Sequence, residues 1–212
     1  MADSDKDILI TPQTGTSSDP SIQFKSGATS GDPITLSVTD DGTTSTLDFS
    51  GSAGQLFSIS NDLSGTVFSA ADGSGIPVIE ADADGTVRLA PFGGVIETGG
   101  PTRENLNTTS GTSVSIDLDQ GSMFWHTAGA GTTTVTFSNG PASDQTQTIM
   151  FVHQQDGTGN RAISWPGGVS WAENVEPPES TGPNDIDVYT IQVINKGGTT
   201  YYMITLAVRN AS

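Results

Sequence analysis

The side chains best suited to catalysis or metal binding are scarce in this chain. It contains two histidines, His126 and His153, and no cysteine. A zinc site would need further ligands at short spacing from a histidine, and neither histidine has them; no H-E-x-x-H motif is present. Serines are plentiful, but no Gly-x-Ser-x-Gly elbow marks a nucleophile. We therefore expect both histidines to occupy ordinary strand positions, and we expect no enzymatic activity, no cofactor and no metal site.

Acidic turns are the next candidates. Asp82-Ala83-Asp84-Gly85 resembles the start of a calcium loop, but a complete loop needs another oxygen ligand and a closing glutamate. Because Asp-Gly pairs strongly favour β-turns, we interpret this segment as a hairpin turn. Asp40-Asp41-Gly42 and Asp185-Ile186-Asp187 receive the same interpretation. The 24 acidic residues make any single carboxylate pair uninformative about glycoside hydrolysis, so a glycan-degrading depolymerase is only a third hypothesis.

Two tryptophans form the most distinctive aromatic feature. Trp165 and Trp171 lie six residues apart across the turn Pro166-Gly167-Gly168. Such a pair could stack on a sugar ring, which gives the hypothesis of a glycan-binding site. Tryptophan is highly buried on average, so the alternative is that both residues cap a β-sandwich core and anchor the Pro-rich loop that follows. We favour the second interpretation and keep both.

Composition excludes several classes of partner and site. The chain of 212 residues carries 7 Lys and Arg against 24 Asp and Glu, a net charge of −17. Such acidity opposes binding to nucleic acid or to anionic membranes, so we expect neither partner. The absence of cysteine removes disulfides and thiolate chemistry. No apolar run reaches the length of a membrane span and the first residues are acidic, so we expect a soluble protein without a secretory signal.

Short alternations of apolar and polar residues, separated by turn signals, predict an all-β protein. Four segments in the first half are spaced about ten residues apart, which favours a β-meander or a small solenoid-like module. Further strands are expected at residues 8–10, 21–24 and 33–38. The four regular segments are Gln55 to Ile59, Gly65 to Ser69, Ile76 to Glu80 and Gly85 to Leu89. Pro77 would remove a ladder hydrogen bond, so we expect its strand at a sheet edge.

A Gly- and Pro-rich stretch near residues 92–107 interrupts this pattern and marks a linker. We expect an N-terminal β module over residues 1–101 and a C-terminal antiparallel β-sandwich, jelly-roll-like, over residues 102–212. Alternation predicts strands in the second part, and Lys196-Gly197-Gly198 predicts a hairpin turn between two of them. These strands lie at residues 113–118, 133–137, 149–152, 189–193 and 200–206.

The second half also resembles a β-domain of virion structural proteins and tail fibres of tailed bacteriophages. The resemblance covers residues 114 to 206. The motifs that carry it are Thr134-Val135-Thr136-Phe137-Ser138-Asn139-Gly140-Pro141-Ala142, Arg161-Ala162-Ile163-Ser164-Trp165-Pro166, Val169-Ser170-Trp171, Asp187-Val188-Tyr189-Thr190 and Gly197-Gly198-Thr199-Thr200-Tyr201-Tyr202. Residues 54 to 90 resemble a module common in marine phage structural proteins, especially those of cyanophages.

The resemblance implies a non-enzymatic building block of the virion that forms homo-oligomers, often trimers, and binds other virion proteins. We expect an exterior capsid decoration (cement) protein or a short fibre subunit, with the N-terminal module docking on neighbouring subunits. The alternative is a tail-fibre or receptor-binding protein for host attachment, which would recognise a host surface glycan through Trp165 and Trp171. The acidity places a shell-associated copy on the outer face, away from packaged DNA.

Overall fold

The computed structural model describes residues 21–24 and 33–211, so the strand expected at residues 8–10 lies outside the described residues. The chain divides into two compact units, residues 1–99 and 100–212. Strands make up 55% of the structure and helices 3%, which confirms the all-β prediction. The helices of the described ranges are single 3-10 turns at Leu118–Gln120 and Ala172–Asn174, and none of them could span a membrane.

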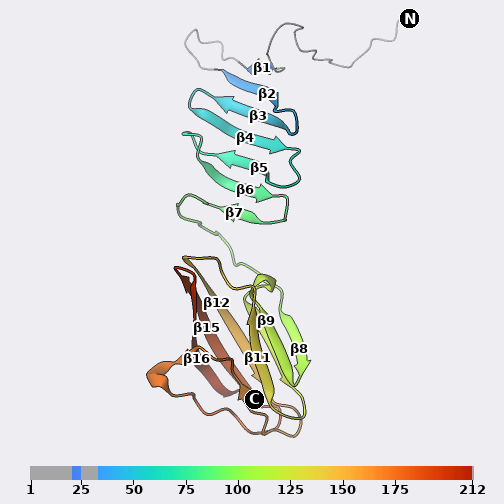
Figure 1. The fold of residues 1–212 in the computed structure, drawn as a ribbon, viewed down its shortest axis with the longest axis vertical. Coiled ribbons are helices and arrows are strands. Elements are labelled where there is room, and N and C mark those ends of the chain that lie inside the picture. The colour runs from blue at the N-terminus through green and yellow to red at the C-terminus, as the bar shows by residue number, and fades with distance from the viewer. Residues whose placement is uncertain (1–20, 25–32, 212) are drawn as a thin grey trace, which may run out of the picture. The chain divides into compact units, whose positions relative to one another are not determined.

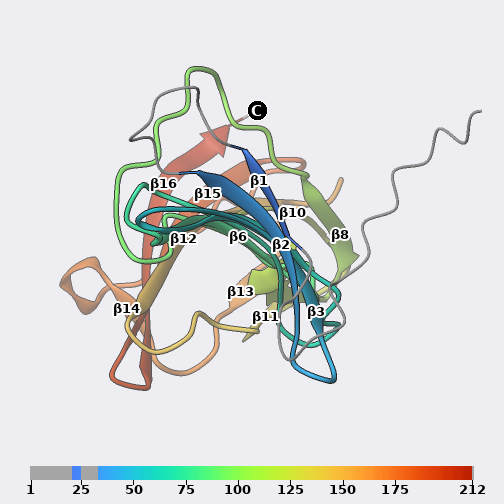
Figure 2. The ribbon, with the colours of Figure 1, turned by 90° about the horizontal axis from the view of Figure 1, so that it is seen from above.

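The N-terminal unit is one sheet in which each strand pairs antiparallel with the next along the chain (Figure 1). Viewed along the stack of strands, the sheet is a single curved layer (Figure 2). Its strands are β1 (Ser21–Phe24), β2 (Ile34–Asp40), β3 (Ser45–Gly51), β4 (Gly54–Ser60), β5 (Thr66–Ala71), β6 (Pro77–Asp82) and β7 (Val87–Leu89).

Register separates the side chains of this sheet into an apolar face and a polar face. Cross-strand partners form continuous rows, and neighbouring rows point to opposite faces because side chains alternate along each strand. One apolar row contains Ile22, Leu36, Phe49, Phe57, Ala70, Ile79 and Leu89, and a second contains Val38, Leu47, Ile59, Phe68, Ala81 and Val87. The polar row between them contains Ser21, Ser37, Asp48, Ser58, Ser69, Glu80 and Arg88.

The prediction that Pro77 marks an edge strand is wrong, because β6 lies between β5 and β7. Pro77 is the first residue of β6 and pairs with Ala71, next to a register irregularity in β5. On its other side β7 is only three residues long and pairs with residues 79–81. The proline therefore stands where no ladder hydrogen bond is required.

The C-terminal unit contains a six-stranded and a three-stranded sheet, with orders β14-β16-β15-β12-β10-β8 and β13-β11-β9. Its strands are β8 (Asn107–Gly111), β9 (Ser113–Asp117), β10 (Met123–Ala128), β11 (Thr133–Ser138), β12 (Gln145–Gln154), β13 (Ile163–Ser164), β14 (Val169–Trp171), β15 (Ile186–Lys196) and β16 (Thr199–Ala211).

The six-stranded sheet is mixed and the three-stranded sheet is parallel, which corrects the prediction of an antiparallel sandwich. From β8 to β13 the chain alternates between the two sheets, and each strand lies parallel to the strand two positions earlier. Only β12, β15 and β16 pair antiparallel. Because the chain crosses to the other sheet after each strand, it re-enters a sheet two strands later in the same direction. The two neighbouring strands in that sheet are therefore parallel. The β15–β16 hairpin turns at Gly197 and Gly198, both with positive φ, as expected for a two-residue turn.

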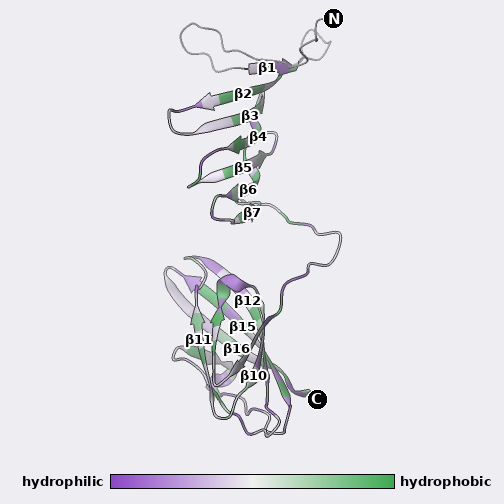
Figure 3. Ribbon diagram, turned by 90° about the vertical axis from the view of Figure 1, so that its right-hand side faces the viewer, coloured by the Kyte–Doolittle hydropathy of each residue, from purple (hydrophilic) through white to green (hydrophobic). Residues whose placement is uncertain are grey.

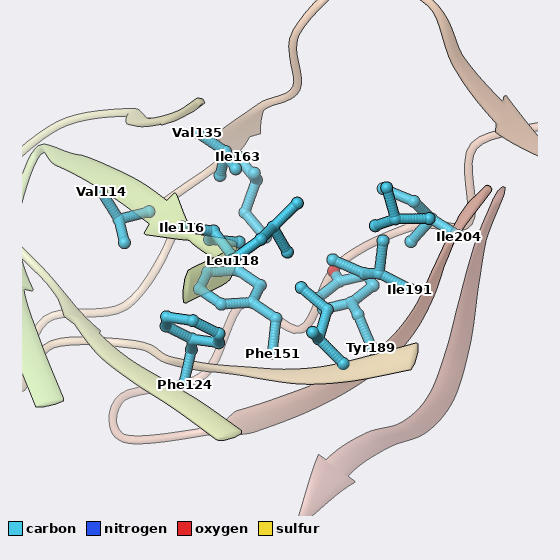
Figure 4. Close-up of a cluster of buried hydrophobic side chains, with 12 residues drawn as sticks. Val114, Ile116, Leu118, Phe124, Val135, Phe151, Ile163, Tyr189, Ile191 and Ile204 are labelled. Atoms are coloured by element: carbon cyan, nitrogen blue, oxygen red, sulfur yellow. The ribbon is translucent and has the colours of Figure 1, made fainter. Parts of the chain in front are cut away.

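The core of the C-terminal unit consists of side chains from both of its sheets (Figure 4). Hydrophobic and hydrophilic residues alternate along the strands (Figure 3), and the buried hydrophobic side chains form one cluster. The buried cluster contains Val114, Ile116, Leu118, Phe124, Val135, Ile149, Phe151, Ile163, Tyr189, Ile191, Val193 and Ile204. This unit therefore encloses its own hydrophobic core.

Candidate functional site

Trp165 and Trp171 come together at one side of the C-terminal core. Their ring centroids lie 5.5 Å apart with an interplanar angle of 80°, so one ring presents its edge to the other. Trp165 makes the same kind of contact with Tyr189 at 5.1 Å and with Phe151 at 5.8 Å. The short strands β13 and β14 flank the turn between the two tryptophans, and β14 pairs with β16.

This arrangement favours the core-capping interpretation of the tryptophans. Both rings are half-buried and pack against the core cluster, and the Trp165 Nε1 atom is buried without a hydrogen-bond partner. A sugar platform needs ring faces open to solvent, whereas edge-to-face packing uses the ring faces within the cluster. Glycan binding at these residues remains a prediction that the geometry does not favour.

The two histidines form a buried polar row. His126 in β10 is the register partner of His153 in β12, and His153 is the partner of Asp187 in β15. The imidazole rings lie nearly parallel, with centroids 6.2 Å apart. Thr109 extends the row into β8, where its hydroxyl lies 2.8 Å from His126 Nδ1. Sequence reasoning placed each histidine in a strand but missed the row, because registers between strands far apart in the chain decide it.

Burial keeps these histidines neutral. It lowers the pKa of His126, and it lowers that of His153 to about 4, with a smaller contribution from His126 and partial compensation by Asp187. His126 Nε2 lies 3.0 Å from the Gly111 carbonyl oxygen, and His153 Nε2 lies 3.2 Å from the Thr133 hydroxyl. Both side chains are fully buried, so neither can reach a substrate in solution.

Asp187 shows that the predicted turn at Asp185-Ile186-Asp187 is wrong. Asp187 lies inside β15 and is buried. Its carboxylate accepts hydrogen bonds from the Ser180 N–H at 2.7 Å, the Ser180 hydroxyl at 2.6 Å and the Asn210 N–H at 3.1 Å. These three donors satisfy a buried charge and fix the preceding loop to the sheet, which is a structural role.

The other acidic segments are turns, as predicted. Asp84 accepts the Thr86 N–H at 2.8 Å, which lowers its pKa, and Gly85 has φ of 92°. Asp82 pairs with Arg88 and accepts the Thr66 hydroxyl. Asp41 accepts hydrogen bonds from the N–H groups of Thr43 and Thr44 within its own turn. Within residues 21–24 and 33–211, no three His, Asp or Glu side chains are arranged to hold a metal ion.

The apolar face of the N-terminal sheet is a further functional candidate. Ile59, Val87 and Leu89 are 47%, 61% and 49% exposed although each belongs to an apolar row. Phe57 contacts the rings of Phe49 and Phe68 edge-to-face, at 5.6 and 5.2 Å, so the aromatic residues cluster on this face. Contiguous exposed apolar surface of this kind marks interaction sites. Sequence alternation predicted the strands but could not show that the described residues of this unit form one sheet with no second layer.

Comparison of the chain with protein-family models, with curated proteins and with solved structures gives no match.

Proposed function

We propose that this protein is a non-enzymatic structural subunit of a tailed-bacteriophage virion, an exterior capsid decoration or short fibre protein that works as a homo-oligomer, with three copies expected. In this proposal the N-terminal meander is the assembly module and the C-terminal sandwich projects from it or covers a neighbouring surface. The partners are other virion proteins.

The observation that carries the proposal is the contrast between the two units. The C-terminal unit encloses a core, and its buried histidines and Asp187 are hydrogen-bonded within the fold. The N-terminal unit leaves apolar side chains exposed along its sheet. A C-terminal unit with its own core, joined to an N-terminal unit with an exposed apolar face, is suited to a building block of a larger assembly. The sequence resemblance to virion proteins is the reason for proposing that this assembly is a virion.

Quantitative mass spectrometry of purified particles of the phage that encodes the chain tests this proposal. Hundreds of copies per particle would support capsid decoration, and a few to a few dozen would support a tail or fibre position. Absence from purified particles would contradict both.

The receptor-binding alternative has its own test. Binding to host cells or a glycan array would be measured for the wild type, Trp165→Ala and Trp171→Ala, with far-ultraviolet circular dichroism as the folding control. Binding that is lost in folded variants would favour glycan recognition, and no binding by the wild type would contradict it. Turnover of a host polysaccharide by the purified protein would instead favour the depolymerase hypothesis.

A further inference from the structure

Within the described residues of the N-terminal unit, 21–24 and 33–99, no second layer covers the apolar face of the sheet. A sheet with one apolar side becomes stable when that side packs on another element. With seven strands about 4.8 Å apart, the face is roughly 29 Å wide. Its two apolar rows lie about 7 Å apart along the strands. A continuous apolar area of this size exceeds the scattered single residues that ordinary surfaces expose.

The distribution of charge in the chain indicates which kind of partner could cover this face. The chain has a net charge of −17, so two copies repel each other across most of their surfaces. Neither apolar row contains a charged residue, whereas the polar row includes Asp48, Glu80 and Arg88. A basic partner would be attracted to carboxylates; neither apolar row has one, and Asp40, which lies at the end of β2 on the same side as Leu36 and Val38, accepts the Ser45 hydroxyl. Identical uncharged rows on a second copy would meet these rows without placing like charges in direct contact.

Several polar groups on the opposite face, in contrast, are hydrogen-bonded or ion-paired within the sheet. The Asp48 carboxylate accepts hydrogen bonds from the Gln55 amide at 2.8 Å and the Thr39 hydroxyl at 3.3 Å, and Arg88 pairs with Asp82. Ser58 and Ser69, at the centre of this face, are buried. The polar side is thus compatible with facing water.

We infer that the apolar face of β1–β7 is a homotypic interface, covered in the assembled protein by the same face of other copies of this chain. This inference deepens the proposed function, since it names the partner and the surface of the proposed assembly module. It is also compatible with the acidity of the N-terminal part: residues 1–104 carry 15 acidic and 4 basic side chains, yet both apolar rows in this range are free of charge.

Two lysine substitutions in the full-length protein test the inference. Ile59→Lys puts a charge in the middle of the apolar face, and Thr39→Lys puts the same charge on the polar face near Asp48. Both change the net charge from −17 to −16, so overall charge cannot explain a difference between them. Ile59 is 47% exposed and Thr39 is exposed, so each sheet should still form. Circular dichroism checks this.

Sedimentation equilibrium would measure the assembly state of the three proteins. We expect an oligomer for the wild type and for Thr39→Lys, and a dissociation constant about 100-fold higher or more for Ile59→Lys, because an unpaired charge would be buried in the interface. A monomeric wild type would overturn the inference, as would an Ile59→Lys oligomer of unchanged affinity.

A second measurement locates the contact without disturbing it by charge. The chain has no cysteine, so Ile59→Cys and Thr39→Cys each create one unique thiol for a pyrene label. Excimer emission from the Ile59 label, but not from the Thr39 label, would support contact between apolar faces. The reverse pattern would overturn it. Neither result depends on the copy number in particles, so failure of this inference leaves the proposed virion function separately testable.

Discussion

The two units of this chain use the same alternation of apolar and polar residues and reach opposite outcomes. Every fully buried hydrophobic residue among those described lies between Val114 and Ile204, in the C-terminal unit. In the N-terminal unit the buried residues are Ser58 and Ser69, while the apolar side chains stay partly or largely exposed. The difference is the second layer: the C-terminal chain switches sheets and folds back on itself, whereas the N-terminal strands follow one another in a single sheet. Alternation specifies a face, and topology decides what covers it.

The largest effect that this comparison predicts comes from truncation inside the closed core. Ile191 is fully buried in β15, and Ile191→Ala should lower the free energy of unfolding of the C-terminal unit by about 4 kcal/mol. All three tryptophans, Trp125, Trp165 and Trp171, lie in this unit, so urea unfolding followed by tryptophan fluorescence reports on it selectively. Gln192→Ala, at the exposed neighbouring position, is the control and should change the value by less than about 0.5 kcal/mol. Equal effects of the two variants would contradict a sealed core.

Acid should weaken the same unit through His153. Its pKa is about 4 in the fold and about 6.5 when unfolded, so the unfolded chain binds the proton first as pH falls. Stability is complete above pH 6.5 and decreases toward pH 4, by about 3 kcal/mol from this group. His153→Gln should remove this part of the pH dependence. Glu179, whose pKa burial raises, acts in the opposite direction but equally in both proteins, so the difference between their urea-unfolding profiles isolates the histidine. Parallel profiles would contradict the prediction.

A glycine in the C-terminal loops gives a smaller, purely steric effect. Gly159 has φ of 79°, and a β-carbon there would lie against the Thr181 carbonyl oxygen and 2.9 Å from the carbonyl carbon of Gly182. Gly159→Ala should therefore cost about 2 kcal/mol. Gly167→Ala is the matched control, because nothing lies within 4 Å of its β-carbon position. The midpoint of thermal unfolding should be lower for Gly159→Ala than for Gly167→Ala. The same midpoint for both would show that the loop accommodates the added β-carbon without loss of stability.

Local patterns predicted strands and turns well in both units. The hairpin at Gly197 and Gly198 and the turn at Asp84-Gly85 follow from residues adjacent in the chain. The strands β3, β8, β13 and β14 received no specific prediction: β8 is Thr- and Ser-rich with little apolar alternation, β13 and β14 are only two and three residues long, and the alternation of Leu47 and Phe49 in β3 was missed.

Long-range pairing explains what the sequence could not predict. The parallel partners of β10 and β12 are brought together by crossovers between sheets, and no turn motif marks such a crossover. The position of Pro77 in an inner strand depended on the short length of β7. For the candidate site, the row from His126 to Asp187 depends on register across β10, β12 and β15. Pairwise register of this kind is a property of the tertiary fold.

The smallest effect on folding is expected when the same isoleucine truncation is made in the N-terminal sheet instead of the C-terminal core. Ile79→Ala makes the same truncation as Ile191→Ala, but Ile79 is 39% exposed in the apolar face. In the dissociated chain it should lower the stability of the N-terminal sheet by less than about 1 kcal/mol, because little surface is buried there and no closed cavity is left.

Amide hydrogen exchange on peptides of residues 33–99 would measure the effect of Ile79→Ala, since this unit has no tryptophan or tyrosine. In the assembled protein the same substitution should matter more, because the homotypic interface would bury Ile79 completely. Protection of these peptides should then rise with protein concentration in the wild type and rise less in Ile79→Ala. Protection independent of concentration in both proteins would mean that the sheet is stable as a single layer, and the contrast between the two units would then lie in packing alone and not in their need for a partner.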